Sequence, residues 1–229
     1  MRGDRVLGVD ACKAGWFGIV PVTGGVSAFV AATIGELVAA AEAGGPVEVV
    51  AVDIPIGLPD RGRRQADVLA RKEIGRRWPS VFITPVRTAL DAGDHASATA
   101  RNRALAGEGV SRQAFGLKPK LRQVETWVRT TRQRVVEAHP EVSFAELAGA
   151  PLTARKITWA GAETRRRLLA GAGIVLDDLG APGHHAAVDD VLDAGVVAWT
   201  ARRVARGEAR ARPDPPEVFG DGFPCAIWS

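Results

Sequence analysis

Residues 47–53 read VEVVAVD and give the strongest strand signal in the chain. The run is short, rich in valine, and bounded by GGP at residues 44–46 and by IP at residues 54–55. An apolar run without alternation indicates a strand covered on both faces, as in parallel sheets. It ends in Asp53, where the prolyl bond breaks it. The stretch therefore predicts an α/β fold.

A second strand of this kind lies at residues 5–9 (RVLGV) and ends in Asp10. Residues 16–22 and 26–31 are two further strands around a glycine turn, and an Ala-rich helix follows to about residue 43. Ligands of open α/β sheets bind beyond the carboxyl ends of neighbouring strands. Asp10 or Asp53 alone is more often a turn or cap residue, but together they favour one shared site.

Residues 184–194 (HHAAVDDVLDA) place acidic side chains at the start of the last long helix, about residues 187–206. Asp190 and Asp193 are three residues apart and therefore share one helix face. A divalent cation between them would turn their repulsion into attraction. Helix capping is the alternative, and it is favoured for this stretch taken alone, because acids in a first turn complement the helix dipole.

The middle of the chain, about residues 60–132, is predicted to be a basic helical insertion. One segment of it is crowded with the basic residues Arg61, Arg63, Arg64, Arg71, Lys72, Arg76 and Arg77. They form either a solvated helix face or phosphate contacts. Residues 134–138 (RVVEA) are a fifth strand that contains Glu137, and His139 after it is interpreted as a structural hydrogen-bonding residue. Residues 209–216 are expected to be extended, and residues 225–228 either add a short strand or anchor the chain end.

Composition places the chain among ordinary globular proteins. It has 229 residues, of which 46% are hydrophobic and 24% charged, and no linker or repeat divides it, so we expect one domain over residues 1–229. The pI is about 9.6, but the Arg-, Ala- and Gly-rich composition indicates bias and does not itself predict nucleic-acid binding. Residues 1–4 (MRGD) do not begin a signal peptide, and no run is long enough to span a membrane. Cys12 and Cys225 fit a reduced cytoplasmic protein.

Several stretches, in chain order, carry a resemblance to a known family. They are Gly8-Val9-Asp10 with Gly15-Trp16, residues 51–59 (AVDIPIGLP), Ser80-Val81-Phe82 with Pro85-Val86-Arg87, residues 137–141 (EAHPE) with Phe144, and residues 189–194 (DDVLDA). On these residues the chain resembles DUF429, a family regarded as predicted ribonuclease H-like nucleases. The Asp-x-x-Asp-Ala of the last helix is also similar to the end of RuvC-type Holliday-junction resolvases.

This resemblance implies a ribonuclease H-like fold. Its mixed five-stranded sheet would have three antiparallel strands and then two parallel ones, flanked by helices, with extra helices inserted in the middle. The first, fourth and fifth strands would be parallel neighbours. Asp10, Asp53 and Glu137 would then meet at one edge, opposite Asp190 and Asp193.

Carboxylates so close together cannot all stay ionised without cations. Oxygen ligands select Mg²⁺ or Mn²⁺, and two such ions about 4 Å apart clamp the attacking water and the leaving oxygen of a phosphoryl displacement. We expect two ions, with Asp10 bridging them and with Asp53 and either Asp190 or Asp193 holding one each. Glu137 is expected to orient a ligand or a water.

The roles of four other residues stay open at this point. Lys13 and Arg87 are either phosphate contacts of a bound nucleic acid or surface charges. His184 or His185, just before the acidic helix, would assist proton transfer, although this interpretation is the less favoured one.

Three functions compete on this sequence. The first is a metal-dependent nuclease that hydrolyses DNA or RNA. The second is a non-catalytic nucleic-acid-binding protein, which has no need for acids that repel phosphate. The third and least favoured is an actin-like ATPase or sugar kinase. Residues 10–15 (DACKAG) match the first phosphate-binding loop of those proteins only in part. Oligomeric state is left open, although a junction resolvase would need a symmetric homodimer.

Overall fold

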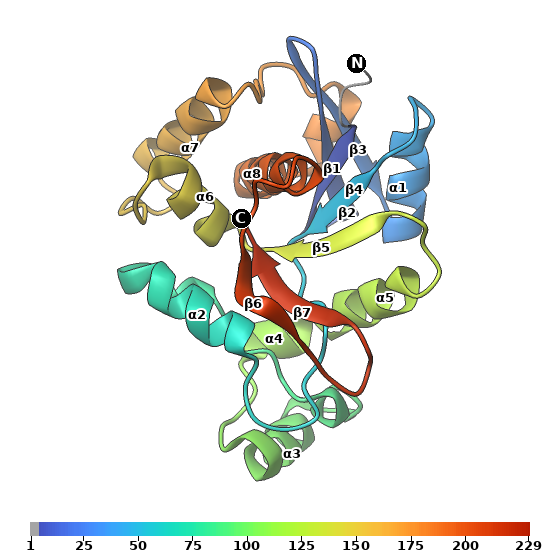
Figure 1. Cartoon of the computed structure of the whole chain (residues 1–229), viewed down its shortest axis with the longest axis vertical. Coiled ribbons are helices and arrows are strands. Elements are labelled where there is room, and N and C mark those ends of the chain that lie inside the picture. The colour runs from blue at the N-terminus through green and yellow to red at the C-terminus, as the bar shows by residue number, and fades with distance from the viewer. Residues whose placement is uncertain (1–4) are drawn as a thin grey trace.

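Residues 5–229 build one mixed sheet of seven strands with helices on both faces, as seen in a computed structural model (Figure 1). The stretch MRGD at residues 1–4, which is not expected to begin a signal peptide, lies outside the described residues. The strands are β1 (Val6–Cys12), β2 (Gly15–Val22), β3 (Gly25–Ala31), β4 (Val49–Val52), β5 (Arg134–Ala138), β6 (Ala211–Val218) and β7 (Pro224–Trp228). Their order across the sheet is β3-β2-β1-β4-β5-β7-β6.

The first five strands pair as the family resemblance implies. β1 pairs antiparallel with β2, and β2 with β3, whereas β1, β4 and β5 are parallel neighbours. The prediction of five strands was wrong, because β7 adds in parallel to β5 and β6 closes the sheet antiparallel to β7. β6 reads ARPDPPEV, and its prolines conceal a strand because they cannot donate to a ladder. It is an edge strand that pairs on one side, with an irregular middle between Arg212 and Glu217.

Eight α-helices and three 3₁₀ turns surround the sheet of the described chain. The helices are α1 (Ile34–Glu42), α2 (Gln65–Glu73), α3 (His95–Ala106), α4 (Arg112–Gly116), α5 (Lys118–Val128), α6 (Pro140–Ala148), α7 (Trp159–Gly171) and α8 (Val188–Ala205). The turns are η1 (Gly75–Ser80), η2 (Arg87–Ala89) and η3 (Ala181–His185). No described helix has both the length and the apolar character of a membrane span.

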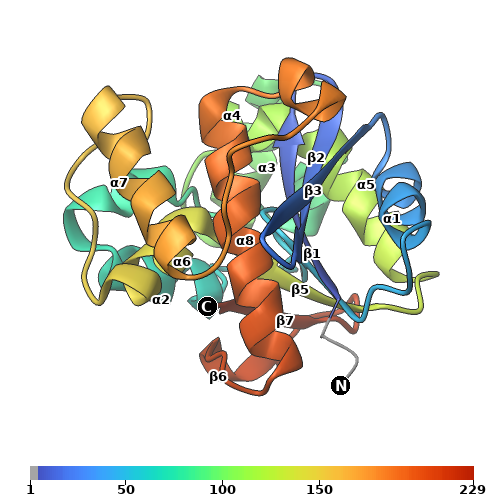
Figure 2. The same ribbon diagram turned by 90° about the horizontal axis from the view of Figure 1, so that it is seen from above.

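The two faces of the sheet carry two separate cores. α8 covers one face, and α1 with α5 covers the other (Figures 1 and 2). Along β4, Val49 and Ala51 point into the α8 core, whereas Val50 and Val52 point into the α1–α5 core. This burial on both faces explains why residues 49–52 of β4 are apolar without alternation. The insertion between β4 and β5 thus supplies α5 to one of the two main layers.

α8 lies backbone to backbone on β1 at Gly8. A Cβ atom at this position would stand 2.0 Å from the Ala198 nitrogen and 2.4 Å from the Ala194 oxygen. Both neighbours are backbone atoms of α8, so no side-chain rotation relieves the clash. Gly8 and the small residues Ala194 and Ala198 therefore set the distance between helix and sheet.

We expect Gly8→Ala to lower the free energy of unfolding by about 3 kcal/mol or more, because α8 must move away from β1 to admit the methyl group. Chemical denaturation measures the loss. The control is Gly35→Ala in α1, where the nearest atom would be 3.8 Å away and the change should be neutral or stabilise by up to about 1 kcal/mol. Equal stability of the two variants would contradict this account of the helix contact.

Candidate metal centre

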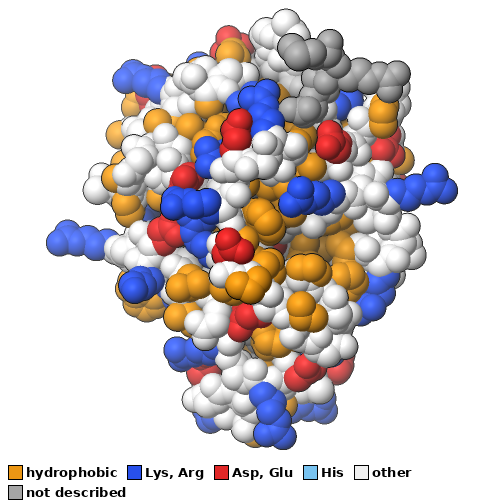
Figure 3. Space-filling view, in the orientation of Figure 1, with side chains coloured by type: hydrophobic (Ala, Val, Ile, Leu, Met, Phe, Trp, Pro, Cys, Tyr) orange, Lys and Arg blue, Asp and Glu red, His pale blue; other side chains and the backbone are white. Residues whose placement is uncertain are grey.

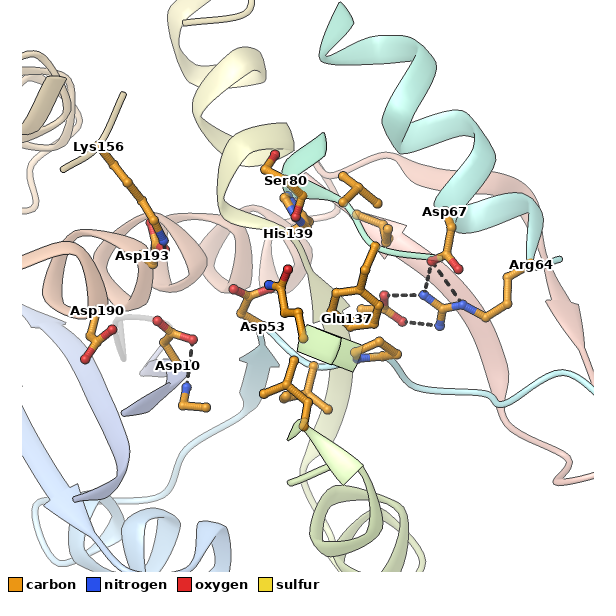
Figure 4. A pocket seen from close by; sticks show the side chains of 18 residues that line it. Asp10, Asp53, Arg64, Asp67, Ser80, Glu137, His139, Lys156, Asp190 and Asp193 are labelled. Atoms are coloured by element: carbon orange, nitrogen blue, oxygen red, sulfur yellow. Dashed lines mark hydrogen bonds and ion pairs between the residues drawn. The ribbon is translucent and has the colours of Figure 1, made fainter. Parts of the chain in front are cut away.

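The carboxyl ends of β1 and β4 bring two aspartates together beneath the start of α8 (Figure 4). Asp10 is buried within β1, and Asp53 follows β4 directly, with its backbone N–H donating to the Val9 carbonyl at 2.9 Å. Asp193 reaches the same space from the second turn of α8 and is 1% exposed. The structure thus brings together three of the five acids that the sequence analysis names.

Asp10, Asp53 and Asp193 each offer a carboxylate oxygen, and these oxygens all lie within 4.8 Å of one another. Asp193 Oδ1 is buried and has no hydrogen-bond partner among residues 5–229. An all-oxygen donor set with an unpartnered buried oxygen matches the preference of Mg²⁺ and Mn²⁺. These three residues therefore fit a divalent cation.

Asp190 also lines the cavity but is engaged elsewhere. Its Oδ2 accepts a hydrogen bond from the backbone N–H of Ala187 at 3.2 Å, at the start of α8. This is the capping role that the sequence offered as the alternative to metal binding. Asp190 is not one of the three residues whose oxygens converge.

Glu137 lies opposite Val52 in the sheet, but its charge is already matched. Arg64 donates to both of its oxygens at 2.8 Å, and the same guanidinium binds Asp67 at 2.5 Å (Figure 4). Arg64 is fully buried. Glu137 also accepts from the backbone N–H of Ile56 at 2.7 Å, so it fixes the loop that follows Asp53. Its contacts are those of a residue that positions the loop.

Lys156 is the site residue that the sequence analysis missed. It lies in the loop before α7, and its ammonium group bonds Asp193 Oδ2 and stands 3.8 Å from Asp189 Oδ2 (Figure 4). No local motif marks it, because its partners are more than 30 residues away in the sequence. The available signal was that lysine is rare in this chain, where only five of the 30 basic residues are lysines.

A cavity of about 210 Å³ opens onto these groups. His139 also lines it, with Nε2 3.3 Å from the Ser80 carbonyl and with a buried Nδ1 that has no partner in the described chain. The structural role predicted for His139 agrees with the Ser80 contact, but its position in the cavity was not foreseen. His184 and His185 are exposed and are not among the described residues that line this cavity.

Lys13 and Arg87, expected to be either phosphate contacts or surface charges, have other surroundings. Lys13 is exposed in the turn between β1 and β2. Arg87 is bound by Glu125 and by Asp221. Neither residue lines the cavity among those described.

Residues 8–218 match the family described as a protein of unknown function, DUF429. The chain belongs to the DUF429 family. No curated protein and no solved structure matches it. The matched region of this DUF429 protein runs from β1 into β6 and so includes the three converging aspartates and Lys156.

Burial controls the ionisation of the DUF429 site. It raises the pKa of Asp53 to about 7, where Lys156 acts in the opposite direction and Glu137 adds to the rise. Burial likewise raises the pKa of Asp193 to about 7 despite the Lys156 contact. The pKa of Asp10 is raised well above its ordinary value by burial and then by the charges of Asp53 and Asp193. One lysine therefore does not neutralise the negative charge of these three carboxylates, whereas an added divalent cation would.

We expect Asp53→Asn to stabilise the metal-free protein increasingly as pH rises. Between about pH 4 and about pH 7 the unfolded Asp53 carboxyl ionises before the folded one, so the parent loses stability over this window. Asparagine carries no such penalty, and we expect an advantage of about 1 kcal/mol or more at pH 8. Denaturation with a chelator at pH 5, 6, 7 and 8 measures the difference. A difference that does not grow with pH would contradict the raised pKa.

We expect Arg64→Met to cost about 3–5 kcal/mol of stability, because it leaves Glu137 and Asp67 buried without their cation. Arg63→Met is the matched control, since Arg63 pairs with Glu108 at the surface, with half of its side chain exposed, and should cost less than about 1 kcal/mol. Urea denaturation of the two variants measures the contrast. Similar losses in both would show that the buried pair is not needed to hold the loop after Asp53.

Proposed function

We propose that this protein is a divalent-metal-dependent nuclease that hydrolyses phosphodiester bonds in DNA or RNA. The observation that carries the proposal is the convergence of oxygens from Asp10, Asp53 and Asp193 beside an accessible cavity. Carboxylate clusters of this composition are the usual means of holding Mg²⁺ or Mn²⁺ against a phosphate group.

The strand order supports a ribonuclease H-like fold for this enzyme. The segment β3-β2-β1-β4-β5 has three antiparallel strands followed by parallel ones, and α8 crosses β1 with its acids at the same end. β6 and β7 extend that arrangement. The family's resemblance to nucleases and this topology point in the same direction.

The chain's own residues divide the work of the proposed reaction. Asp10, Asp53 and Asp193 would hold the cation, which supplies Lewis-acid activation of water and neutralises phosphate charge. Glu137 and Arg64 keep the loop after Asp53 in place through the Ile56 N–H. Lys156 supplies positive charge in a cavity that would otherwise repel a phosphate. His139 lines the cavity, and its buried Nδ1 has no partner within residues 5–229.

The two-ion arrangement expected from the sequence is the less supported part of the proposal. The three converging carboxylates account for one ion. Holding a second ion through Asp190 would require this residue to give up its hydrogen bond with Ala187. The metal dependence of the proposed reaction needs only the ion that Asp10, Asp53 and Asp193 would hold.

The non-catalytic binding function is less well supported than hydrolysis. A binder without catalysis would present basic groups to phosphate, but the central cavity is acidic. On the face seen in Figure 3, Lys and Arg side chains are scattered among acidic and apolar ones and do not form one continuous basic strip. Dispersed arginines of this kind match the solvated-face interpretation of the sequence.

A cleavage screen tests the function. Labelled single-stranded DNA, duplex DNA, RNA and a four-way junction are incubated with the protein and Mg²⁺ or Mn²⁺. We expect cleavage of at least one substrate, and we expect EDTA to abolish it. Asp10→Asn and Asp193→Asn should each lower the cleavage rate by more than the 10–100-fold typical for loss of a residue that only orients a ligand.

The variants decide whether the cavity is responsible for any cleavage. Arg63→Met, on the surface, should cleave like the parent. Cleavage that survives in Asp10→Asn would arise from a contaminant or from another site. Failure of the Mn²⁺-loaded parent to cut any of the four substrates would count against a nuclease.

A further inference from the structure

We propose that the Lys156 ammonium permanently takes the place of a second cation, so that this acidic site holds one divalent ion and one lysine. The inference rests on the proposed function, because it concerns how the same site would balance its charge. It differs from the two-ion arrangement expected from the sequence. A lysine of fixed charge at this place would stabilise negative charge on a phosphate and does not exchange with solvent ions.

The carboxylates of α8 have their oxygens committed in a way that leaves room for one ion. Asp193 uses Oδ2 for Lys156, whereas its Oδ1 is buried and unpartnered within residues 5–229. Asp190 Oδ2 accepts from Ala187 at the helix start. Asp189 lies 3.8 Å from the Lys156 ammonium through its own Oδ2. Lys156 thus pairs with two of the three acids of α8, Asp189 and Asp193.

The loop that carries Lys156 is built to hold it there. The Ala154 carbonyl accepts hydrogen bonds from Arg77 and Arg165, each at 3.0 Å. Arg165 is fully buried, and Glu141 binds it through both oxygens at 2.7 and 2.9 Å. These contacts lie two residues before Lys156, so the side chain extends from an anchored point.

Backbone packing fixes the other side of this loop. The Arg155 carbonyl accepts from the Thr158 hydroxyl at 2.8 Å, and Thr158 caps α7. A Cβ at Gly161 would stand 1.9 Å from the Arg155 oxygen, so glycine is needed for α7 to approach this carbonyl. Lys156 is therefore held between two fixed points, Ala154 and Thr158. The backbone that carries the Lys156 side chain is thus fixed on both sides.

A lysine and a metal ion differ in what they offer a phosphate. The ammonium has three N–H donors and one positive charge, which suits contact with a phosphoryl oxygen. Only the metal ion lowers the pKa of a bound water toward neutrality. One ion with one lysine therefore separates water activation from charge stabilisation, and both are supplied within one acidic cluster.

Calorimetric titration of Mn²⁺ into the metal-free protein tests this assignment. The parent and Lys156→Arg, which keeps the charge, should each bind one ion. Lys156→Met removes the charge and should bind a second ion, or the first about tenfold more tightly, since the competing ammonium is gone. Lys72→Met removes an exposed lysine of α2 and should bind as the parent does.

Thermal unfolding gives a second readout that does not depend on activity. Metal-free Lys156→Met should melt below the parent, because Asp193 loses its partner, and saturating Mn²⁺ should raise its melting temperature more than that of the parent. Two ions bound by the parent, or unchanged binding in Lys156→Met, would overturn the lysine assignment and leave the metal-dependent function standing. Absence of Mn²⁺ binding in the parent and in Lys156→Met would overturn both.

Discussion

The backbone contact between α8 and β1 at Gly8 is the constraint on which the site depends. A helix that rested on a side chain there would sit farther from the sheet and would carry Asp193 away from Asp10. Ala194 and Ala198 continue the close approach on the helix side, one of them directly beside Asp193. The charges of the three aspartates repel one another. The packing of small residues is therefore what keeps them close together. The fold supplies the energy that holds three aspartates together, and the raised pKa values record this cost.

Two buried arginines neutralise some acidic residues of this region and leave the charge of others unmatched. Arg64 matches Glu137 and Asp67, and Arg165 matches Glu141. Within residues 5–229, no arginine pairs with Asp10 or Asp53, and Asp193 shares one lysine with Asp189. The excess negative charge is thereby confined to one small cavity, whereas the surrounding carboxylates act as structural anchors. Such confinement is the electrostatic condition for selective cation binding.

Much of this arrangement followed from the sequence, and the rest depends on long-range contacts. Unalternated valines predicted the parallel core of β4, and the aspartates that end β1 and β4 predicted the site. The spacing of Asp190 and Asp193 placed both residues on one helix face. It did not indicate that Asp190 would accept a hydrogen bond from Ala187. Arg64 was one member of a basic cluster interpreted as either a solvated helix face or phosphate contacts, because its partner Glu137 lies 73 residues away. Lys156 and the edge strand β6 were missed for related reasons: the first has no local motif, and the second is rich in proline.

The proline content of β6 also affects how copies of the chain meet. An exposed sheet edge normally offers a row of free N–H groups to which another chain can add a strand. In β6, Pro213, Pro215 and Pro216 have no N–H to offer, and the irregular pairing between Arg212 and Glu217 bends this edge away from a flat template. Growth of the sheet from molecule to molecule is therefore blocked at this side. A two-fold assembly formed by strand addition would therefore not use the β6 edge.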